Sequence, residues 1–302
     1  MAELLIGPSE LALIQDHPVS TGLMMDYAEA SENPAIMLFA GLMLRRTRFI
    51  DDALERGVKN GATQVVILGA GFDTRAYRFR DLLKNCRVIE VDAASTQAYK
   101  KRRVQEVLHD LPTNLTYSTM DLVNDDLIDG LRRAKFVSRE KTVYIWEGVC
   151  MYLPENSVLK TLGAIALHSA AGSTLVADYA NDLGIQMGKF VPNGAGGIPT
   201  HWSEPWIFGV PGANGSEFFR ELGFDPGVPL SAYDPEINRR YGTRKDGSSY
   251  AARVLEKLRT HQAQATPKEL PSGFLDAQKA VTAAGGAYWF TELTVMDKAK
   301  GR

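Results

Sequence analysis

The stretch that decides the fold runs from Val65 to Arg75 and reads VVILGAGFDTR. A short apolar run breaks directly into a glycine-rich turn, and a helical pattern follows it. This order is typical of a buried parallel strand that presents a ligand to the N-terminus of the next helix. Glycine at positions 69 and 71 removes side chains where a ligand would approach the backbone. A turn of this kind can also serve tight packing alone, so the residues downstream must decide between the two interpretations.

Short Val- and Ile-rich segments alternate with helical patterns after this turn. We expect strands near residues 64–69, 86–91, 115–120, 141–147 and 173–178. Helical patterns lie between them, near residues 74–84, 95–109, 124–134 and 155–170. The alternation predicts an α/β fold with a doubly wound, mostly parallel sheet, covered by helices on both faces and joined by right-handed crossovers. A final strand is expected near 287–296.

The segments outside this alternation have a different character. A long amphipathic helix is predicted from Asn33-Pro34, an N-cap followed by proline, to Gly57. Residues 181–215 are rich in glycine, proline and aromatic residues, which indicates a lid or substrate loop. We predict a single domain over 1–302, made of four parts: a helical cap at 1–60, a cofactor-binding core at 61–180, the loop at 181–215 and a C-terminal part of the sheet at 216–302.

Composition and charge exclude several classes of protein. The chain has 302 residues, a formal net charge of −2 and only two cysteines, Cys86 and Cys150. The longest apolar run, 35–44, is too short to span a bilayer. The basic run at 100–103 is expected on a solvated helix face. We therefore expect a cytoplasmic protein with no signal peptide, membrane span, metal site or nucleic-acid partner.

An acid ends the second predicted strand and points to a nucleoside ligand. Asp92 follows the glycine turn by about twenty residues, the spacing at which a carboxylate accepts hydrogen bonds from ribose hydroxyls. It could instead cap the next helix. Thr74 replaces the third glycine of the dinucleotide fingerprint, and Asp73 would repel a pyrophosphate. These two residues favour an adenosine ligand without phosphates. An NAD(P)-dependent oxidoreductase remains the alternative of another class, beside a cofactor-binding protein without catalysis.

The run VVILGAGFDTRAYRF, from Val65 to Phe79, resembles motif I of the leucine carboxyl methyltransferase family, in its bacterial, tetracenomycin-type O-methyltransferase branch. Shorter segments resemble the family in the same order, at 46–52, 90–92, 121–122 and 146–153. The family uses S-adenosylmethionine. The resemblance therefore implies a Rossmann-like, mostly parallel sheet of seven strands, with an N-terminal helical extension and an insertion after the fifth strand.

The resemblance also implies roles for individual residues. It gives cofactor contacts to Arg46, Gly69, Ala70, Gly71, Asp92, Asp121, Leu122 and Glu147. In this scheme the glycines flank the methionine part, Asp92 holds the ribose, and Asp121 with Leu122 lies at the adenine. Glu147 faces the amino group of the cofactor or its reacting end.

The resemblance implies two catalytic candidates on the acceptor side, Arg46 for a second time and Tyr152. Arg46 matches an arginine that meets a carboxylate at the site, with Arg48 as its rival, and Tyr152 matches a tyrosine near the substrate pocket. Arg75 and Arg78 are expected to pair with acids structurally.

The choice between a carboxylate and a hydroxyl as methyl acceptor depends on which general bases the sequence offers. A carboxylate is ionised at neutral pH and needs no base, whereas a hydroxyl needs one within hydrogen-bond reach. His201 and Tyr152 are the only base candidates, and an arginine suits a carboxylate by bidentate pairing. We expect O-methylation of a small, polyketide-like carboxylate to a methyl ester. A phenol or alcohol, or a protein C-terminal carboxylate, remains an alternative acceptor, and the sequence gives no oligomeric state.

Overall fold

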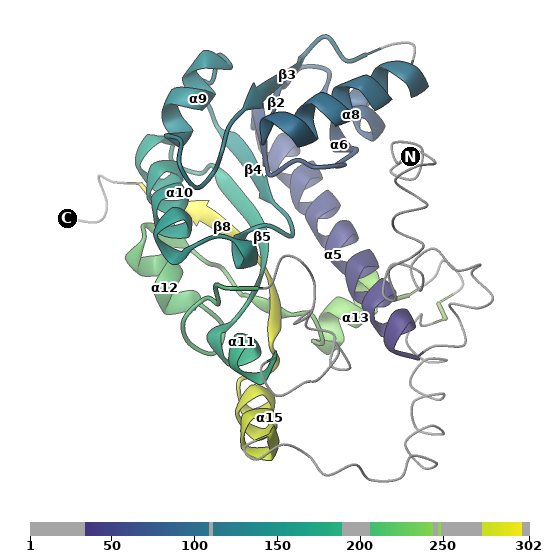
Figure 1. Ribbon diagram of the computed structural model, residues 1–302, viewed down its shortest axis with the longest axis vertical. Helices are drawn as coiled ribbons and strands as arrows, with labels where there is room; N and C mark the ends of the chain where they lie inside the picture. The colour runs from purple at the N-terminus through teal and green to yellow at the C-terminus, as the bar shows by residue number, and fades with distance from the viewer. Residues whose placement is uncertain (1–33, 109–110, 189–205, 244–246, 249–273, 298–302) are drawn as a thin grey trace.

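The computed structural model describes residues 34–108, 111–188, 206–243, 247–248 and 274–297 (Figure 1). Within them a central sheet carries eight strands: β1 (Gln64–Leu68), β2 (Arg87–Asp92), β3 (Leu115–Thr119), β4 (Thr142–Trp146), β5 (Thr174–Ala180), β6 (Phe224–Asp225), β7 (Leu230–Ser231) and β8 (Tyr288–Val295). The strand order is β3-β2-β1-β4-β5-β8-β6, and β7 also pairs with β8. The predicted doubly wound α/β fold is confirmed.

The sheet has one more strand than the seven predicted, because one edge strand is split. β1 to β5 pair in parallel, and β8 runs antiparallel to β5. β6 pairs with the end of β8 at Val295, while β7 pairs nearer its start at Phe290. Both short strands therefore occupy the same edge position beside β8.

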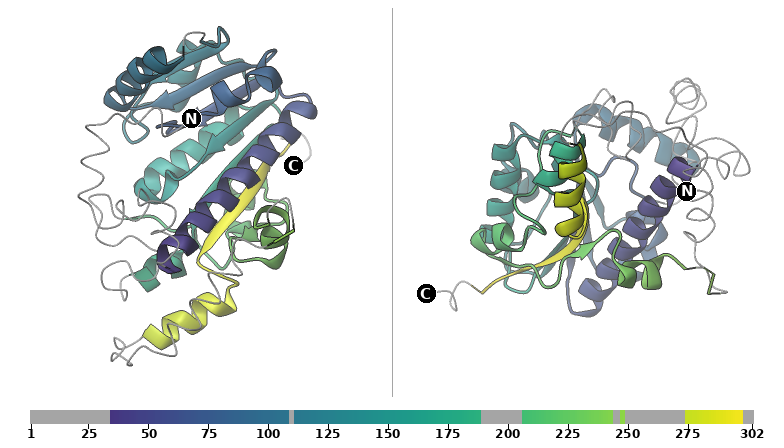
Figure 2. Two further views of the ribbon diagram at one scale, coloured as in Figure 1. Left: turned by 90° about the vertical axis from the view of Figure 1, so that its right-hand side faces the viewer. Right: turned by 90° about the horizontal axis from the view of Figure 1, so that it is seen from below.

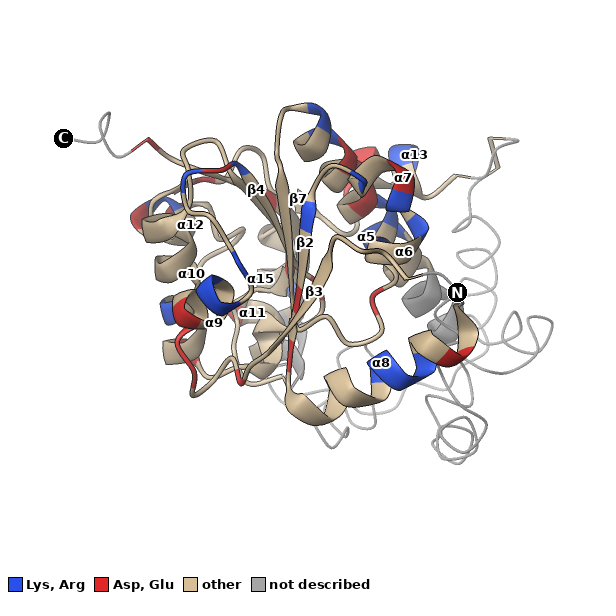
Figure 3. Cartoon of the chain, turned by 90° about the horizontal axis from the view of Figure 1, so that it is seen from above, with Lys and Arg blue, Asp and Glu red and all other residues tan. Residues whose placement is uncertain are grey.

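Helices cover both faces of this sheet, as Figure 3 shows with the sheet nearly edge-on. One face carries α5 (Pro34–Lys59), α6 (Arg75–Arg78), α7 (Arg80–Leu83), α8 (Ala94–Val107) and α13 (Pro235–Tyr241). The other carries α9 (Leu127–Arg133), α10 (Glu155–His168) and α12 (Ser216–Glu221). Each layer has its own buried apolar cluster against the sheet. The remaining elements are η1 (Cys150–Tyr152), α11 (Asp182–Gly188) and α15 (Phe274–Ala283).

The long helix α5 lies along β8 and runs in the same general direction (Figure 2). Phe49 stacks on Phe290 with ring centroids 5.5 Å apart, and further on Arg56 pairs with Glu292 at 2.7 Å. The helix does not end at Gly57, as predicted, but at Lys59. Gly57 has a packing role, because a Cβ there would overlap Cγ2 of Val143 on β4. The glycine lets the helix approach the sheet closely.

Three other expectations need correction. The predicted helix at 74–84 is two short helices, α6 and α7, with Phe79 between them. The predicted loop at 181–215 begins with α11, and Asn181 bridges to Val210; its part at 189–205 lies outside the described residues. Lys100, expected on a solvated face, is buried and pairs with Glu90 at 2.7 Å. α8 thus buries one cation of its basic run and exposes Lys101 and Arg102.

Among the described residues, no helix is both long and apolar enough to cross a bilayer.

Candidate functional site

The site lies where β1 and β4 end and the adjoining turns begin. A cavity of about 410 Å³ opens there. Its wall includes Arg46, Gly69, Ala70, Gly71, Arg75 and Glu147. Carboxyl ends of parallel strands meet at one edge of a sheet, which is where α/β proteins of this kind bind ligands. The structure therefore brings five of the predicted site residues, namely Arg46, the glycine turn and Glu147, to one cavity.

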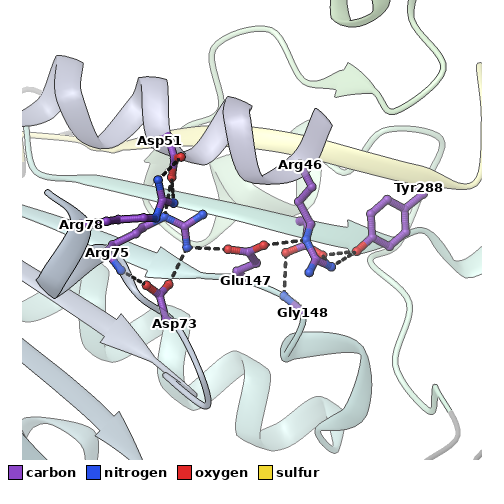
Figure 4. Close-up of polar contacts among 9 residues, drawn as sticks. Arg46, Asp51, Asp73, Arg75, Arg78, Glu147, Gly148 and Tyr288 are labelled. Atoms are coloured by element: carbon purple, nitrogen blue, oxygen red, sulfur yellow. Dashed lines mark hydrogen bonds and ion pairs between the residues drawn. The ribbon is translucent and has the colours of Figure 1, made fainter. Parts of the chain in front are cut away.

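Glu147 is the centre of a charged network at this edge (Figure 4). Its Oε1 atom accepts a hydrogen bond from Arg46 Nε at 2.8 Å, and its Oε2 atom accepts one from Arg75 Nη1 at 2.6 Å. Burial would raise the pKa of Glu147, but Arg75 and Arg46 hold that pKa below its usual range. Glu147 is therefore an ionised link between two arginines.

Arg75 extends the network toward α5. Its Nε donates to Asp51 at 2.8 Å, its Nη1 also donates to Asp73, and Asp51 in turn pairs with Arg78. The side chain of Arg75 is only 3% exposed. Among the described residues, its Nη2 atom is buried without a hydrogen-bond partner. The expected pairing of Arg75 and Arg78 with acids is observed, and Arg75, a residue of the cavity wall, also has one buried donor left over.

Asp178, near the end of β5, contacts the other side of Arg46. The Asp178 carboxylate is fully buried and accepts hydrogen bonds from the backbone N–H of Gly148 at 2.7 Å and from the Tyr288 hydroxyl. Arg46 Nη1 donates to Asp178 at 3.3 Å and to Tyr288 at 3.2 Å. Burial raises the pKa of Asp178 despite the nearby Arg46. Burial alone would lower the pKa of Arg46, but Asp178, Tyr288 and Glu147 raise it well above its usual value.

Asp92 joins the end of β2 to the glycine turn. Its carboxylate accepts hydrogen bonds from the backbone N–H groups of Gly71 and Ala93. It makes no side-chain cap on α8, whose N-cap residue is Ala93. A carboxylate has about four acceptor positions. Asp92 therefore supports the turn and still has acceptor capacity for a ligand hydroxyl.

Comparison with known proteins identifies the family. A model described as leucine carboxyl methyltransferase matches residues 1–166, which is more than half of the chain. The chain belongs to the leucine carboxyl methyltransferase family.

Two curated relatives carry the name "Putative S-adenosyl-L-methionine-dependent methyltransferase". The one from Streptomyces avermitilis is 36% identical over 130 residues, 43% of this chain and 45% of that protein. The one from Bacillus subtilis is 31% identical over 139 residues, 46% of this chain and 45% of that protein. The chain therefore spans about half the length of the curated relatives it matches. Among solved structures, an O-methyltransferase family protein from Burkholderia thailandensis matches with a TM-score of 0.43 and 16% identity, covering 63% of this chain and 54% of that one.

The other predicted residues of this leucine carboxyl methyltransferase family member lie outside the cavity wall. Asp121 follows β3 beside Asp92, since Met120 N–H donates to the Asp92 carbonyl at 2.8 Å. The Asp121 carboxylate is exposed and accepts from Val123 N–H and from Asn124, which lowers its pKa. Leu122 packs against the buried cluster beneath α9 and α10. These two residues flank the site rather than line it.

The two arginine candidates of α5 separate clearly. Arg46 lines the cavity, whereas Arg48 is exposed and donates to the backbone carbonyls of Tyr241 and Thr243, at 3.1 and 3.2 Å. Tyr152, in η1, meets Trp206 edge-on with ring centroids 6.5 Å apart. His201 lies outside the described residues.

Sequence reasoning missed Asp178 and Tyr288. Asp178 lies near the carboxyl end of a predicted strand, so the argument that selected Glu147 could have selected it as well. Tyr288 starts an antiparallel strand and pairs with Ala180 at the end of β5. Only the strand direction, which the sequence pattern does not carry, brings Tyr288 to the same edge. Within the described residues, no group of three or more His, Cys, Asp or Glu side chains could hold a metal ion.

Proposed function

We propose that this chain is an S-adenosylmethionine-dependent O-methyltransferase that converts a carboxylate of a small molecule to its methyl ester. The observation that carries the proposal is the cavity itself, at the carboxyl ends of β1 and β4. A glycine turn and paired charges line it, in a chain of the leucine carboxyl methyltransferase family. We retain the single-domain division and a cytoplasmic location as parts of this proposal.

The glycine turn fits a cofactor that approaches the backbone. Gly71 has a φ of +41°, and a Cβ added there would meet no atom closer than the Gly69 carbonyl oxygen at 3.9 Å. The space beside Gly71 is therefore open to the cavity that it lines. Gly69, by contrast, has a φ of +63°, and a Cβ there would press on Val149. In our proposal the turn holds the methionine part, and Asp92, with Asp121 and Leu122 beyond it, holds the adenosine.

The unpartnered Nη2 atom of Arg75 supports a position for the amino-acid end of the cofactor beside this arginine. A buried guanidinium nitrogen without an acceptor is costly, and a ligand carboxylate would satisfy it. Glu147 has remaining lone pairs on both oxygens, and these suit the cofactor's ammonium group. We therefore assign the carboxylate to Arg75 and the ammonium to Glu147.

The charge balance of the network favours a cationic ligand. The connected side chains are Arg46, Arg75, Arg78, Asp51, Asp73, Glu147 and Asp178. Four acids face three arginines, so one negative charge is in excess when all are ionised. In the sequence, Asp73 is the acid that favours a cation, but in the structure Arg75 neutralises Asp73. The preference belongs to the whole network.

A carboxylate acceptor agrees with the absence of a free base in the described wall. The wall acids, Asp73 and Glu147, are both paired with arginine, and the pKa of Glu147 is lowered. When bound, S-adenosylmethionine supplies the electrophilic methyl group. The protein then has to hold an already ionised oxygen in line with that methyl group and exclude water, which is catalysis by alignment.

Labelled S-adenosylmethionine, supplied with a panel of aromatic carboxylic acids and phenols, tests the proposal. We expect label to enter a carboxylic acid, and mild alkali to release it in equimolar amount as the ester hydrolyses. A product stable to alkali would reject the carboxylate acceptor and indicate a phenol or alcohol.

A further inference from the structure

Glu147 needs a fixed orientation to hold the ammonium group of a cofactor. Each oxygen of its carboxylate is bound to an arginine, Arg46 on one side and Arg75 on the other. Arg75 is fixed in turn by two further acids. The support of Arg46 comes from Asp178 and Tyr288, and Figure 4 shows Arg46 between Glu147 and Tyr288.

Asp178 contacts the surroundings of Glu147 at two points. Its Oδ2 atom accepts a hydrogen bond from Arg46 Nη1 at 3.3 Å, and its Oδ1 atom accepts one from the Gly148 N–H at 2.7 Å. That N–H belongs to the peptide group that joins Glu147 to Gly148. The Arg46 guanidinium also lies directly against this glycine, since a Cβ there would meet Nη1 at 3.4 Å. Asp178 therefore fixes both the guanidinium that binds the Glu147 side chain and the backbone from which that side chain extends.

Tyr288 donates a hydrogen bond to the same carboxylate from the neighbouring strand. Its hydroxyl donates to Asp178 Oδ2 and accepts from Arg46 Nη1 at 3.2 Å. Tyr288 of β8 is paired with Ala180 of β5, and Asp178 lies two residues before Ala180, on the same face of the sheet. Long side chains in such diagonal positions are within reach of each other. The sheet register therefore brings this hydroxyl to Asp178.

Asp178 is fully buried, so its charge depends on these donors. Burial raises the pKa of Asp178, with a contribution from the nearby charge of Glu147. Arg46 and the Tyr288 hydroxyl act in the opposite direction. Cys150 of η1 also faces Asp178 and donates to its backbone carbonyl at 3.4 Å, but burial raises the pKa of Cys150 and keeps it a neutral thiol. Loss of the Tyr288 hydroxyl would therefore raise the pKa of Asp178 further.

We propose that Tyr288 and Asp178 are positioning residues of the cofactor site: the Tyr288 hydroxyl holds the Asp178 carboxylate, and that carboxylate holds the groups on both sides of Glu147, so that Glu147 faces the ammonium group of the cofactor. The inference rests on the proposed function, since it concerns that same cofactor site. Neither Tyr288 nor Asp178 lies in the described wall of the cavity. Both therefore act through Glu147 and not by touching the ligand.

Titration calorimetry of Tyr288→Phe with S-adenosylhomocysteine, over a series of pH values, tests this assignment. The variant removes the hydroxyl but keeps the ring, which stacks on Trp206 with centroids 5.7 Å apart and meets Phe290 edge-on. Relative to the wild type, we expect affinity to fall about threefold to tenfold, the effect of one lost hydrogen bond. Comparison with the wild type at each pH cancels any ionisation of the ligand itself.

The pH dependence separates positioning from a merely structural role. The loss of affinity in Tyr288→Phe should be largest between the pKa of Asp178 in the wild type and its higher pKa in the variant. In that interval Asp178 is protonated only in the variant and no longer pairs there with the charge of Arg46. Above both pKa values the loss should shrink, because Asp178 is then ionised in both proteins.

Asp178→Asn is an independent test, because it keeps the shape and the acceptor oxygen and removes the charge. Affinity for S-adenosylhomocysteine should fall at least about tenfold, as expected for a lost interaction with a charged group. Addition of Tyr288→Phe to this variant should cause a clearly smaller further loss than in the wild type, since Tyr288 acts through Asp178. An equal further loss would contradict the proposed order of contacts.

Tyr179→Phe is the matched control. Tyr179 is the next residue on β5, packs in the cluster on the opposite face, and its buried hydroxyl donates to the Asn214 carbonyl at 2.6 Å. Its loss should lower the unfolding midpoint but leave the affinity for S-adenosylhomocysteine at the wild-type value at every pH. Wild-type affinity and pH profile in Tyr288→Phe, or an equal loss of affinity in Tyr179→Phe, would overturn the assignment. Failure of S-adenosylhomocysteine to bind the wild type would instead reject the proposed function.

Discussion

The backbone N–H of Gly71 donates a hydrogen bond to the carboxylate of Asp92, twenty-one residues further along the chain. This contact ties the glycine turn after β1 to the end of β2. The same carboxylate also accepts the Ala93 N–H at 2.7 Å. Asp92 therefore shapes the turn before any ligand arrives, and in our proposal its remaining lone pairs accept hydrogen bonds from the ribose.

Asp92→Ala is expected to weaken S-adenosylhomocysteine binding by about tenfold to a hundredfold, since hydrogen bonds to a charged group contribute about 1.5–3 kcal/mol. Titration calorimetry measures this change. Asp81→Ala is the control, because Asp81 is an exposed acid in the first turn of α7. Unchanged affinity in Asp92→Ala would remove the ribose assignment.

Gly71→Ala separates backbone strain from obstruction of the site. Both Gly71 and Gly61 have positive φ, +41° and +92°, and an added Cβ meets no atom closer than 3.9 Å at either position. Each alanine variant should lose about 1–2 kcal/mol of unfolding free energy from strain. Only Gly71→Ala should also lose cofactor affinity, because Gly71 lines the cavity. Equal cofactor affinities in the two variants would place the cofactor elsewhere.

Because of Glu147, the free energy of unfolding should depend on pH in the acid range. Its folded-state pKa lies below its ordinary value, so its contribution is present above about pH 4.3, the unfolded pKa, and is lost as the pH falls through the folded pKa. At pH 7, Glu147→Gln should cost about 3 kcal/mol, because it breaks a buried charged network. The cost should shrink toward pH 3 in denaturant titrations. Glu55→Gln, in the surface ion pair with Lys59, should cost under about 0.5 kcal/mol at either pH.

The buried pair of Glu90 and Lys100 has the opposite pH dependence. Burial raises the pKa of Glu90 to about 7 although Lys100 lies 2.7 Å away. The stability that comes from the protonated carboxyl is full below about pH 4.3 and is lost as the pH rises through 7. Lys100→Met should therefore cost about 3 kcal/mol at pH 8, where Glu90 is charged and left unpaired, and much less at pH 5. A similar cost at both pH values would show that Glu90 is ionised throughout, and the exposed Lys101→Met is the control.

The order of strands and helices was predictable because it depends on local patterns. The apolar run before Gly69 and the alternating segments up to β5 each carry their own signal. The end of α5 was not predictable in this way, since the role of Gly57 is set by Val143, which is distant in sequence. The burial of Lys100 likewise depends on Glu90, a residue of the neighbouring strand.

The site was predictable only in part, for a related reason. Motif resemblance located Arg46, the glycine turn and Glu147, which line one cavity. It left Arg48 as a rival of Arg46, because the direction of each side chain on the helix acquires its meaning only from the other elements that surround it. Asp178 and Tyr288 are 110 residues apart and meet only because β8 is antiparallel to β5.

Isothermal titration of the wild-type chain with S-adenosylhomocysteine and, separately, with NAD tests the central claim most directly. Our account predicts saturable binding of one S-adenosylhomocysteine per chain and no heat from NAD. Binding of NAD without S-adenosylhomocysteine would contradict the account and indicate a nicotinamide-dependent enzyme.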